Sequence, residues 1–248
     1  MSTNPLRILG VIPARYASSR FPGKPLIDLK GKTMIQRVYE GVKKSNILTD
    51  IVVATDDARI EAEVLRFGGK VMMTSAEHPS GTDRCGEVAR KFYDYDVVIN
   101  IQGDEPLVDY RQIDQLATAF IESTTNIATL GIKQVSIEDI LNTNRIKIVV
   151  DNTQNALYFS RSPIPNFANF KENPLAFYPF YRHIGLYGYR TNTLQELVSL
   201  TPTLLEQVES LEQLRWLFYG YKIKVVETNI ETPNIDVPED VEKVISLL

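Results

Sequence analysis

Three cations stand close together in a segment that directly follows a short apolar run, and their types suit a chain of phosphates. They are Arg15, Arg20 and Lys24. Arginine presents a planar fork of donors and lysine a compact point charge, and both bind phosphate oxygens. The pair Pro22-Gly23 bends the backbone so that its amides can approach the same oxygens. We therefore predict a triphosphate-binding loop, with a solvent-exposed basic turn as the alternative, because charge clusters often lie on the surface.

This loop matches neither common phosphate-binding fingerprint. The G-x-G-x-x-G spacing is absent. Gly31-Lys32-Thr33 looks like the end of a P-loop, but Leu26 stands where that motif has its first glycine. The prediction of a phosphate site therefore depends on the three cations.

Two aspartates are candidate ligands for a metal ion that accompanies the phosphates. Asp104 follows the apolar run Val97–Ile101, so its carboxylate is expected to project from the end of a strand. Asp236 stands just ahead of Pro238. Mg²⁺ binds through a few carboxylates together with phosphate oxygens and water, so one or two aspartates are enough. Helix capping is the alternative for Asp236, since aspartate ahead of a proline-initiated helix is a common cap.

Composition narrows the class of protein. The chain has 248 residues, 44% of them hydrophobic, which suits one large α/β domain with a full core. A net charge of −4 argues against nucleic-acid or anionic-membrane binding and favours a small-molecule partner. One cysteine, Cys85, and two histidines cannot supply a zinc site by themselves. No apolar run has the length of a signal peptide or a membrane span, and we expect a cytoplasmic protein.

Apolar runs alternate with amphipathic segments along the first half of the chain, which predicts a doubly wound, largely parallel sheet with crossover helices. Predicted strands are Ile8–Ile12, Ile51–Ala54, Val71–Met73, Val97–Ile101, Ala128–Ile132 and Lys147–Val150, and predicted helices are Met34–Lys44, Ala58–Phe67, Asp83–Phe92 and Arg111–Ser123. Ligands of such sheets collect at the carboxyl ends of the strands. The basic loop, Thr55-Asp56-Asp57 and the segment after Ile101 all follow strands there.

The second half has a different pattern. Prolines and aromatic residues crowd the stretch 160–180, which predicts an excursion from the sheet. Arg182–Tyr189 then reads as a strand, and Leu204–Phe218 as one amphipathic helix. Trp216 and Phe218 are candidates for a subunit contact, with ordinary core packing as the alternative. A last helix is predicted to start at Pro238-Glu239-Asp240.

Eight motifs, in order along nearly the whole chain, identify the sequence as resembling the 3-deoxy-manno-octulosonate cytidylyltransferases, the CMP-Kdo synthetases of lipopolysaccharide-producing bacteria. They are I-P-A-R-Y-A-S-S-R-F-P-G-K-P-L at 12–26, V-A-T-D-D at 53–57, S-G-T-D-R at 80–84, N-I-Q-G-D-E-P at 100–106, A-L-Y-F-S-R at 156–161, R-H-I-G-L-Y-G-Y at 182–189, L-E-Q-L-R at 211–215 and D-V-P-E-D at 236–240. The opening loop alone is shared with other sugar nucleotidyltransferases. Its combination with S-G-T-D-R and H-I-G-L-Y-G-Y is specific.

The resemblance implies a fold and a reaction. The fold is a Rossmann-like nucleotidyltransferase α/β fold, with helices flanking a largely parallel central sheet. It forms one domain over residues 1–248, with an inserted lobe at about 160–220 for sugar binding and dimerisation. The substrates are CTP and the acid sugar Kdo, the products are CMP-Kdo and pyrophosphate for lipopolysaccharide biosynthesis, the cofactor is Mg²⁺, and the assembly is a homodimer.

The resemblance also implies roles for individual residues. The catalytic set is Arg15, Lys24, Asp104 and Asp236, with Mg²⁺ on the two aspartates. Nucleotide-binding residues are Ala14, Arg15, Arg20, Lys24, Ser80, Gly81 and Thr82, and sugar-binding residues are Arg84, Gln102, Arg161, His183, Tyr187, Glu212 and Gln213. Each has a plainer alternative: Ser80-Gly81-Thr82 suits a turn, His183 a structural histidine, and Glu212 a solvated helix position.

Other functions stay open from the sequence. One is the same chemistry with a related acid sugar such as 8-amino-Kdo, and another is a nucleotidyltransferase or glycosyltransferase with a different nucleotide or acceptor. A non-catalytic nucleotide-binding module is the third, although Lys24, Asp104 and Asp236 are all present.

Overall fold

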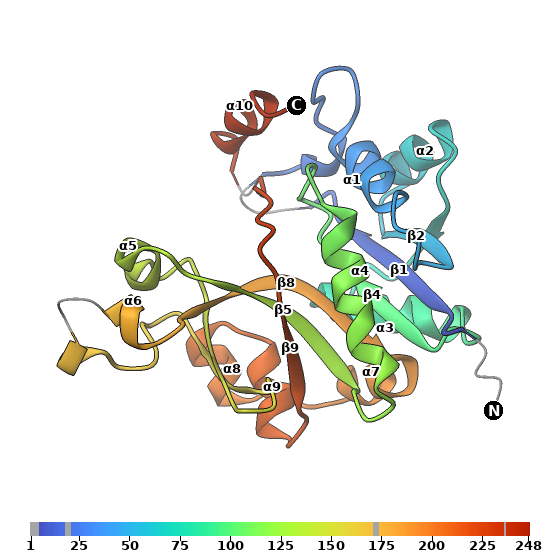
Figure 1. Cartoon of the computed structure of the whole chain (residues 1–248). Coiled ribbons are helices and arrows are strands. Elements are labelled where there is room, and N and C mark those ends of the chain that lie inside the picture. Colours follow the sequence, from blue (N-terminus) through green and yellow to red (C-terminus); the bar gives the residue numbers. More distant parts are fainter. Residues whose placement is uncertain (1–4, 18–20, 171–173, 236) are drawn as a thin grey trace.

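A nine-stranded sheet crosses the centre of the computed structural model, which describes residues 5–17, 21–170, 174–235 and 237–248 (Figure 1). The strands are β1 (Ile8–Ala14), β2 (Asp50–Thr55), β3 (Val71–Met73), β4 (Val97–Asn100), β5 (Ile127–Lys133), β6 (Lys147–Val150), β7 (Ala156–Ser160), β8 (Tyr181–Arg190) and β9 (Ile223–Glu227). The α-helices are α1 (Met34–Val42), α2 (Ala58–Arg66), α3 (Gly81–Lys91), α4 (Tyr110–Thr118), α5 (Ile137–Leu141), α6 (Pro174–Phe177), α7 (Thr191–Leu197), α8 (Leu204–Glu209), α9 (Gln213–Phe218) and α10 (Asp240–Ile245). Short 3₁₀ helices are η1 (Lys24–Leu26), η2 (Ala119–Ile121) and η3 (Ala168–Phe170).

The main path of the sheet runs in the order β3-β2-β1-β4-β8-β5-β9. Neighbours among β1 to β4 are parallel, and so are β5 and β9. β8 pairs antiparallel with both β4 and β5. The hairpin of β6 and β7 joins the sheet through β8. The predicted α/β fold with a mostly parallel central sheet is therefore confirmed, with β8 as the antiparallel strand in its middle.

Alternating side chains of the strands enter two cores, one on each face of the sheet. In β1, Ile8 and Ile12 join a core formed with α1, α2, α4 and α10. Leu9 and Val11 join the opposite core, formed with α3, α7 and α9. Successive strand side chains point to opposite faces, so a strand covered by helices on both sides is apolar throughout. This explains why the first strands of the sequence are continuous apolar runs.

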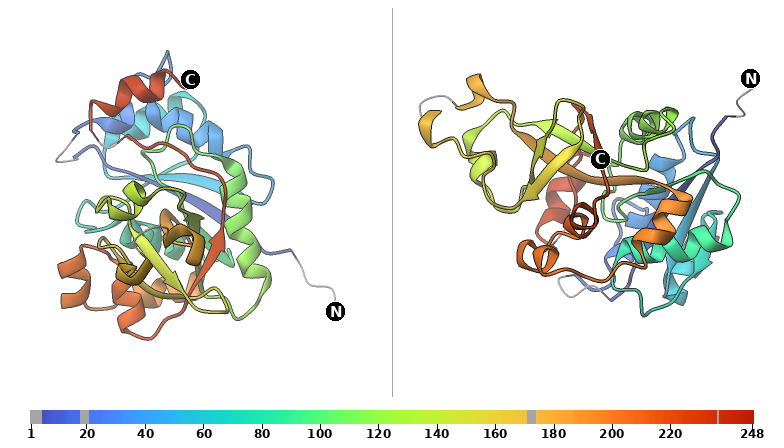
Figure 2. Two further views of the ribbon diagram at one scale, coloured as in Figure 1. Left: turned by 60° about the vertical axis from the view of Figure 1, so that its left-hand side comes forward. Right: turned by 90° about the horizontal axis from the view of Figure 1, so that it is seen from below.

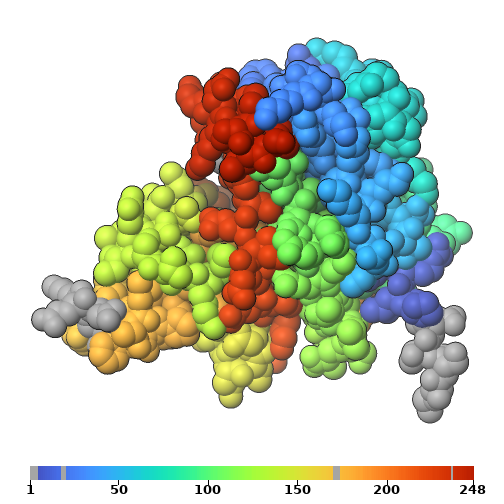
Figure 3. Space-filling view, turned by 45° about the horizontal axis from the view of Figure 1, so that its top comes forward, coloured from blue at the N-terminus to red at the C-terminus, as the bar shows by residue number. Residues whose placement is uncertain are grey.

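The C-terminal helix packs near the start of the chain. Val244 of α10 is buried in the same core as Met34 and Ile35 of α1, and Figure 3 shows α10, in red, against the blue N-terminal elements. By contrast, α5 and α6 extend to one side of the molecule, as Figure 1 and the right-hand view of Figure 2 show. The two ends of the chain therefore contribute to the half of the molecule that holds β1 and β4.

Most boundaries predicted for the first half are correct within a few residues. α3 begins at Gly81, earlier than predicted, because the Ser80 hydroxyl caps it by accepting from the Asp83 amide at 3.1 Å. The predicted helix Arg111–Ser123 ends as α4 at Thr118 and continues as η2.

The single helix predicted over Leu204–Phe218 is wrong. The structure has two short helices, α8 and α9, because Ser210 takes a left-handed conformation with φ of 53° that ends α8. The break rotates the second half of the segment, so Leu211 and Leu214 are buried while Leu204, Val208 and Phe218 are exposed. The predicted apolar face is therefore divided between core and surface.

Residues 160–220 contribute to the main sheet as well as to its surroundings. β8 of this segment lies between β4 and β5, and α7 to α9 follow it. The roles of this segment in sugar binding and dimerisation stay predictions. The pattern of the sequence also left β7, β9, α5 and α7 unassigned, and each is seven residues long or shorter.

Candidate active site

The loops after β1 and β4 meet the start of α3 around a cavity at the carboxyl edge of the sheet, where parallel α/β sheets bind ligands. The cavity has a volume of about 400 Å³. It is lined by Pro13, Ala14, Arg15, Ala17, Lys24, Pro25, Gly81, Gln102, Gly103 and Asp104. Three separate segments therefore place six of the predicted site residues around one space.

Lys24 is held at the first position of η1 with its ammonium group at the cavity. Gly23 before it takes a φ of 74°, which favours glycine, and its amide donates to the Tyr16 carbonyl at 2.9 Å. Lys24 Nζ donates to Asp104 Oδ2 and to the carbonyl of Ile235, both at 2.8 Å. The ammonium group thus joins the basic loop, the segment after β4 and the segment before α10.

The segment that leads to Asp236 is fastened beside Asp104. The amide of Ile235 donates to the Asp104 carbonyl at 3.0 Å, and Thr232 Oγ1 donates to Glu105 Oε2 at 3.0 Å. Asp236 itself lies outside the described residues. What the structure shows is that its chain neighbour Ile235 contacts both Lys24 and Asp104.

Arg15 faces the loop that precedes α3. Its guanidinium donates to the carbonyls of His78 and Ser80, the latter at 3.3 Å. Burial, followed by the neighbouring charge of Arg84, lowers the pKa of Arg15 from its usual value, and an arginine still stays charged. Arg15 is therefore a permanent cation on the wall of the cavity. The predicted phosphate ligand Arg20 lies outside the described residues.

The donor set fits magnesium better than a transition metal. Among the residues that the structure describes, no group of three or more histidine, cysteine, aspartate or glutamate side chains could hold a metal ion. A site with one or two carboxylates does not need such a group, because Mg²⁺ takes its other ligands from phosphate and water. Asp104, at the cavity and partly exposed, is suited to such a role.

Ser80, Gly81 and Thr82 form the start of α3 and contact α9. Ser80 Oγ donates to Glu212 Oε1 at 2.9 Å, and Thr82 Oγ1 donates to Glu212 Oε2 at 2.8 Å. Burial raises the pKa of Glu212, against these hydrogen bonds, which lower it. The Ser-Gly-Thr segment is therefore a helix cap rather than a free turn, and Glu212 is an anchored carboxyl rather than a solvated one.

Arg84 does not line the cavity. It is fully buried in α3, pairs with Asp56 Oδ2 at 2.8 Å and also donates to Thr74 Oγ1. Asp56 belongs to the segment after β2, so this ion pair links that strand end to α3. Arg84 thus holds neighbouring segments together, and its contact with a sugar stays a prediction.

Several polar groups on β8 and α9 are buried without a partner among the described residues. Tyr187 Oη and Gln213 Nε2, both predicted sugar ligands, are two of them. Gln102 Nε2 donates to the Gly185 carbonyl of β8 at 2.6 Å and so connects this region to the cavity. Buried polar groups are normally paired. Tyr189 Oη and Trp216 Nε1 share this condition, and both residues belong to the core on this face of the sheet.

His183 lies in β8 among aromatic rings. Its ring centroid is 5.4 Å from that of Phe159 and 5.1 Å from that of Tyr187, and its Nε2 lies 3.0 Å from Thr129 Oγ1. Burial, with a smaller contribution from Arg182, lowers the pKa of His183 to about 3. His183 is therefore neutral at physiological pH and would contact a sugar through hydrogen bonds rather than charge.

This lowered pKa predicts an acid sensitivity of the fold. The unfolded chain takes up a proton at His183 below about pH 6.5, whereas the folded chain resists it down to about pH 3. Stability from this group is complete above pH 6.5 and falls as the pH drops through that window. We expect His183→Gln to lose less stability than the unchanged chain between pH 7.5 and 4.5, measured by urea unfolding at each pH. Equal losses in the two proteins would contradict the buried neutral state.

Arg161 directly follows β7 and does not line the cavity. Its Nε donates to the Glu209 carbonyl at 3.0 Å, and its guanidinium also reaches the carbonyls of Thr143 and Ser210, both at 3.4 Å. The structure thus places Arg161 beside α8 rather than beside Lys24. The predicted sugar ligands are thus spread over several elements: His183 and Tyr187 lie in β8, Glu212 and Gln213 start α9, Gln102 lines the cavity, and Arg84 lies in α3.

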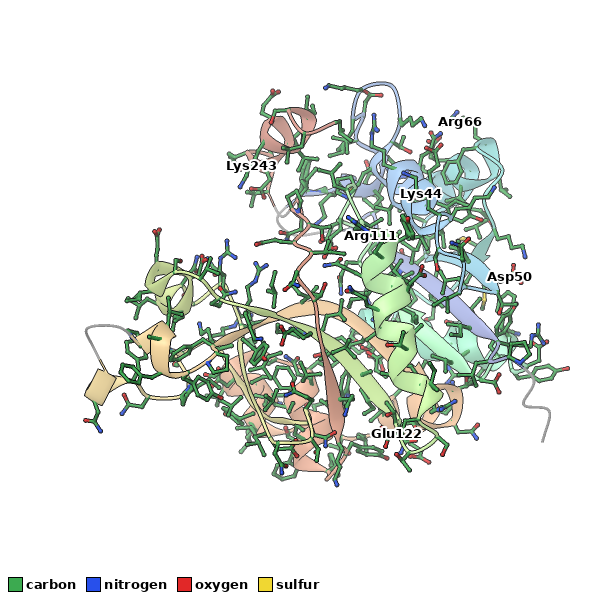
Figure 4. The ribbon with its side chains drawn as sticks, viewed as in Figure 1. Lys44, Asp50, Arg66, Arg111, Glu122 and Lys243 are labelled. Carbon is green, nitrogen blue, oxygen red and sulfur yellow. The ribbon has the colours of Figure 1, made fainter. Side chains whose placement is uncertain are left out.

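A larger cavity, of about 540 Å³, lies at the opposite edge of the sheet and holds none of the predicted residues. Its lining includes Glu122, Thr153 and Lys222. Figure 4 shows Arg111 and Glu122 at opposite ends of the segment that contains α4. Arg111 lies at the end nearer to Lys243 of α10, and Glu122 at the end farther from it. Volume alone therefore does not identify the active site.

The sequence reasoning missed contributions that come from the backbone. Ile235 acts through its amide and carbonyl. Gly103 is a second case: a Cβ there would lie 2.5 Å from the Pro13 carbonyl oxygen, so glycine is what allows the loops after β1 and β4 to approach. The sequence could have indicated the close approach at Gly103, because a glycine stands there between two polar residues after a strand. It could not have indicated Ile235, because that residue contributes only its backbone groups.

Comparison with known proteins gives one consistent result. A cytidylyltransferase family model matches residues 9–224. The chain is 51% identical over 250 residues to the 3-deoxy-manno-octulosonate cytidylyltransferase of Parabacteroides distasonis, with 98% of each chain covered. It is 53% identical over 243 residues to the enzyme of that name from Bacteroides thetaiotaomicron, with 96% of each covered.

A solved structure of CMP:2-keto-3-deoxy-manno-octonic acid synthetase complexed with CTP matches with a TM-score of 0.91 at 42% identity, covering 97% of this chain and 98% of that one. The predicted nucleotidyltransferase fold is thereby confirmed.

Within the described residues, no helix is both long and apolar enough to cross a lipid bilayer.

Proposed function

Because the chain belongs to the cytidylyltransferase family, we infer that it transfers CMP from CTP to 3-deoxy-manno-octulosonate (Kdo), giving CMP-Kdo and pyrophosphate. The observation that carries this function is the cavity in which Arg15 and Lys24 from the β1 loop meet Asp104 from the β4 loop. Two cations and one carboxylate at the carboxyl edge of the sheet suit a triphosphate with its metal ion.

The reaction needs charge neutralisation and positioning more than covalent help. The anomeric hydroxyl oxygen of Kdo attacks the α-phosphorus of CTP and releases its proton to water, and the bond from that phosphorus to the pyrophosphate oxygen breaks. Arg15 and Lys24 offset the negative charge of the phosphates. The positive charge of Lys24 also stabilises the negative charge that develops on the leaving pyrophosphate. Arg20, of the same loop, is proposed to bind the triphosphate with them.

We propose Asp104 and Asp236 as the residues that hold Mg²⁺. When bound, the ion supplies Lewis-acid polarisation of the phosphate oxygens. The pairing is supported by Ile235, the neighbour of Asp236, whose amide binds the Asp104 carbonyl. Lys24 contacts both segments and so keeps them together.

The nucleoside side is proposed to lie at the start of α3. Ala14 and Gly81 line the cavity, and because alanine has only a methyl group and glycine no side chain, their backbone groups are proposed to be open to the base edge. Ser80 and Thr82 support this surface, since Glu212 holds both hydroxyl groups.

The sugar is proposed to lie toward β8 and α9. Gln102, His183, Tyr187, Glu212 and Gln213 supply hydrogen bonds for its hydroxyl groups. Its carboxylate calls for a cation. Arg161 is the better placed of the two predicted arginines, because Arg84 is fully buried and paired with Asp56.

We further propose that the protein is cytoplasmic, because CTP is available in the cytoplasm. We also propose that it forms a homodimer, because apolar side chains of α8 and α9 are exposed. Leu204, Val208 and Phe218 are 79%, 84% and 64% exposed on neighbouring helices, and a second copy could cover them. Trp216 lies in the core instead, so packing explains it.

A pyrophosphate-release assay tests the function. We expect release with Mg²⁺ and CTP plus Kdo, and much less when UTP, ATP or dTTP replaces CTP. Kdo, 8-amino-Kdo, sialic acid and no sugar form the second axis of the assay. Turnover of CTP only with 8-amino-Kdo or sialic acid would keep the chemistry and change the sugar. No release with any pair, from protein shown to be folded, would contradict the enzyme and favour a nucleotide-binding module.

A further inference from the structure

A lysine with no exposed surface lies at the start of β6. Lys147 pairs in register with Ser160 of β7 on one side and with Arg182 of β8 on the other. Moving an ammonium group out of water is costly unless each of its hydrogens finds an acceptor. An apolar side chain would fill the same place without that cost, so the buried ammonium group is expected to have a role beyond packing.

The ammonium group of Lys147 has three acceptors, one for each hydrogen. It donates to the carbonyls of Asn142 at 2.9 Å, of Arg145 at 2.7 Å, and of Arg161. Asn142 and Arg145 belong to the turn before β6, whereas Arg161 directly follows β7. Lys147 therefore ties two separate segments to one point.

The same two segments determine where the guanidinium of Arg161 lies. Its Nη1 reaches the carbonyl of Thr143, in the turn that Lys147 holds, at 3.4 Å. Its backbone amide donates to Glu209 Oε2 at 3.1 Å, and its Nε donates to the Glu209 carbonyl. Lys147 thus fixes the backbone of Arg161 at its carbonyl and the turn against which its side chain rests.

We propose that Lys147 is a positioning residue that orients Arg161 toward the carboxylate of the acid sugar, and so sets the affinity for that substrate without touching it. The proposal rests on the proposed function, in which Arg161 binds the sugar. A guanidinium recognises a carboxylate through a planar fork, whose strength depends on orientation. Loss of Lys147 would leave three carbonyls without their donor and free the turn and Arg161 to move.

The test varies Kdo and CTP separately in steady-state assays of Lys147→Met, Arg161→Ala and the double variant. We expect Lys147→Met to raise KM for Kdo about tenfold, as when a hydrogen bond to a charged group is weakened, with KM for CTP within about twofold. In the double variant, Lys147→Met should raise KM for Kdo no further than Arg161→Ala does alone, because both changes act on one interaction.

The matched control is Lys224→Met, which removes another sheet lysine. Lys224 Nζ donates to the Thr153 carbonyl at 2.7 Å. This control should change neither KM.

A purely structural role would raise both KM values together or lower the amount of active enzyme, and either result would overturn the proposal. So would a further rise of KM for Kdo in the double variant. If Lys147→Met does not fold, Lys147→Arg replaces it with the same expected split, because its larger head group displaces the carbonyls.

Amide hydrogen exchange separates this proposal from the proposed function. An unchanged chain that does not turn over CTP with Kdo would refute the function. Faster exchange in Lys147→Met over residues 142–146 and 161–162 would still support the tie between Lys147 and Arg161, and unchanged exchange there would refute it.

Discussion

Asp104→Asn is expected to lower kcat for CMP transfer by about a thousandfold or more, with the fold unchanged. The substitution keeps the shape of the side chain and removes the charge that pairs with Lys24 Nζ at 2.8 Å and is proposed to hold Mg²⁺. It should also weaken Mg²⁺ binding, because an amide oxygen is a poorer ligand than a carboxylate. Turnover at saturating CTP and Kdo over a series of Mg²⁺ concentrations measures both effects.

The matched control for that variant is Asp109→Asn. Asp109 follows on the same connection, caps α4 and pairs with Arg111, without lining the cavity. Asparagine is also a good helix cap, so the control should keep stability and turnover. Normal turnover of folded Asp104→Asn would remove Asp104 from the metal site.

Lys24→Ala is expected to reduce kcat/KM for CTP by about 100-fold to 1000-fold, the range for losing a group that stabilises charge in the transition state. The loss should affect CTP more than Kdo, because Lys24 lies on the phosphate side, with Asp104 and Ile235 as its partners. Steady-state kinetics with each substrate varied in turn gives the comparison.

Lys32→Ala is the control for the lysine. Lys32 lies in the same connection between β1 and α1, but its Nζ pairs with Glu40 Oε2 at 2.6 Å on the surface. The side chain of Lys32 is 44% exposed. We expect its removal to leave CTP use unchanged, since surface ion pairs contribute little. If Lys24→Ala used CTP as well as this control does, the phosphate role of Lys24 would be refuted.

Local sequence patterns predicted the first half of the fold well because its signals are short-range. β3 has the predicted bounds, and β1, β2 and β4 begin or end within two residues of them. β1 and β4 are apolar runs buried on both faces, which is the pattern that a parallel strand covered by helices produces. The site loops could be placed for the same reason, since they follow those strands directly.

What the sequence did not predict depends on distant partners. The insertion of β8 between β4 and β5 is a choice among pairings that its ten residues do not encode. Ser210 gives no local sign that it takes a left-handed conformation and divides the predicted helix. The pairing of Arg84 with Asp56 joins residues 28 positions apart. Candidate residues could be named from motifs, but their partners required the fold.

The place of β8 also sets an order for assembly during synthesis. β4 and β5 both pair with β8 and not with each other, so the sheet stays in two parts until residue 190 has left the ribosome. β1 to β4 can pair among themselves before then, because their contacts lie within the first 100 residues. Until β8 arrives, the nascent chain therefore has an open strand edge at β4, where mispairing with another chain is most readily expected.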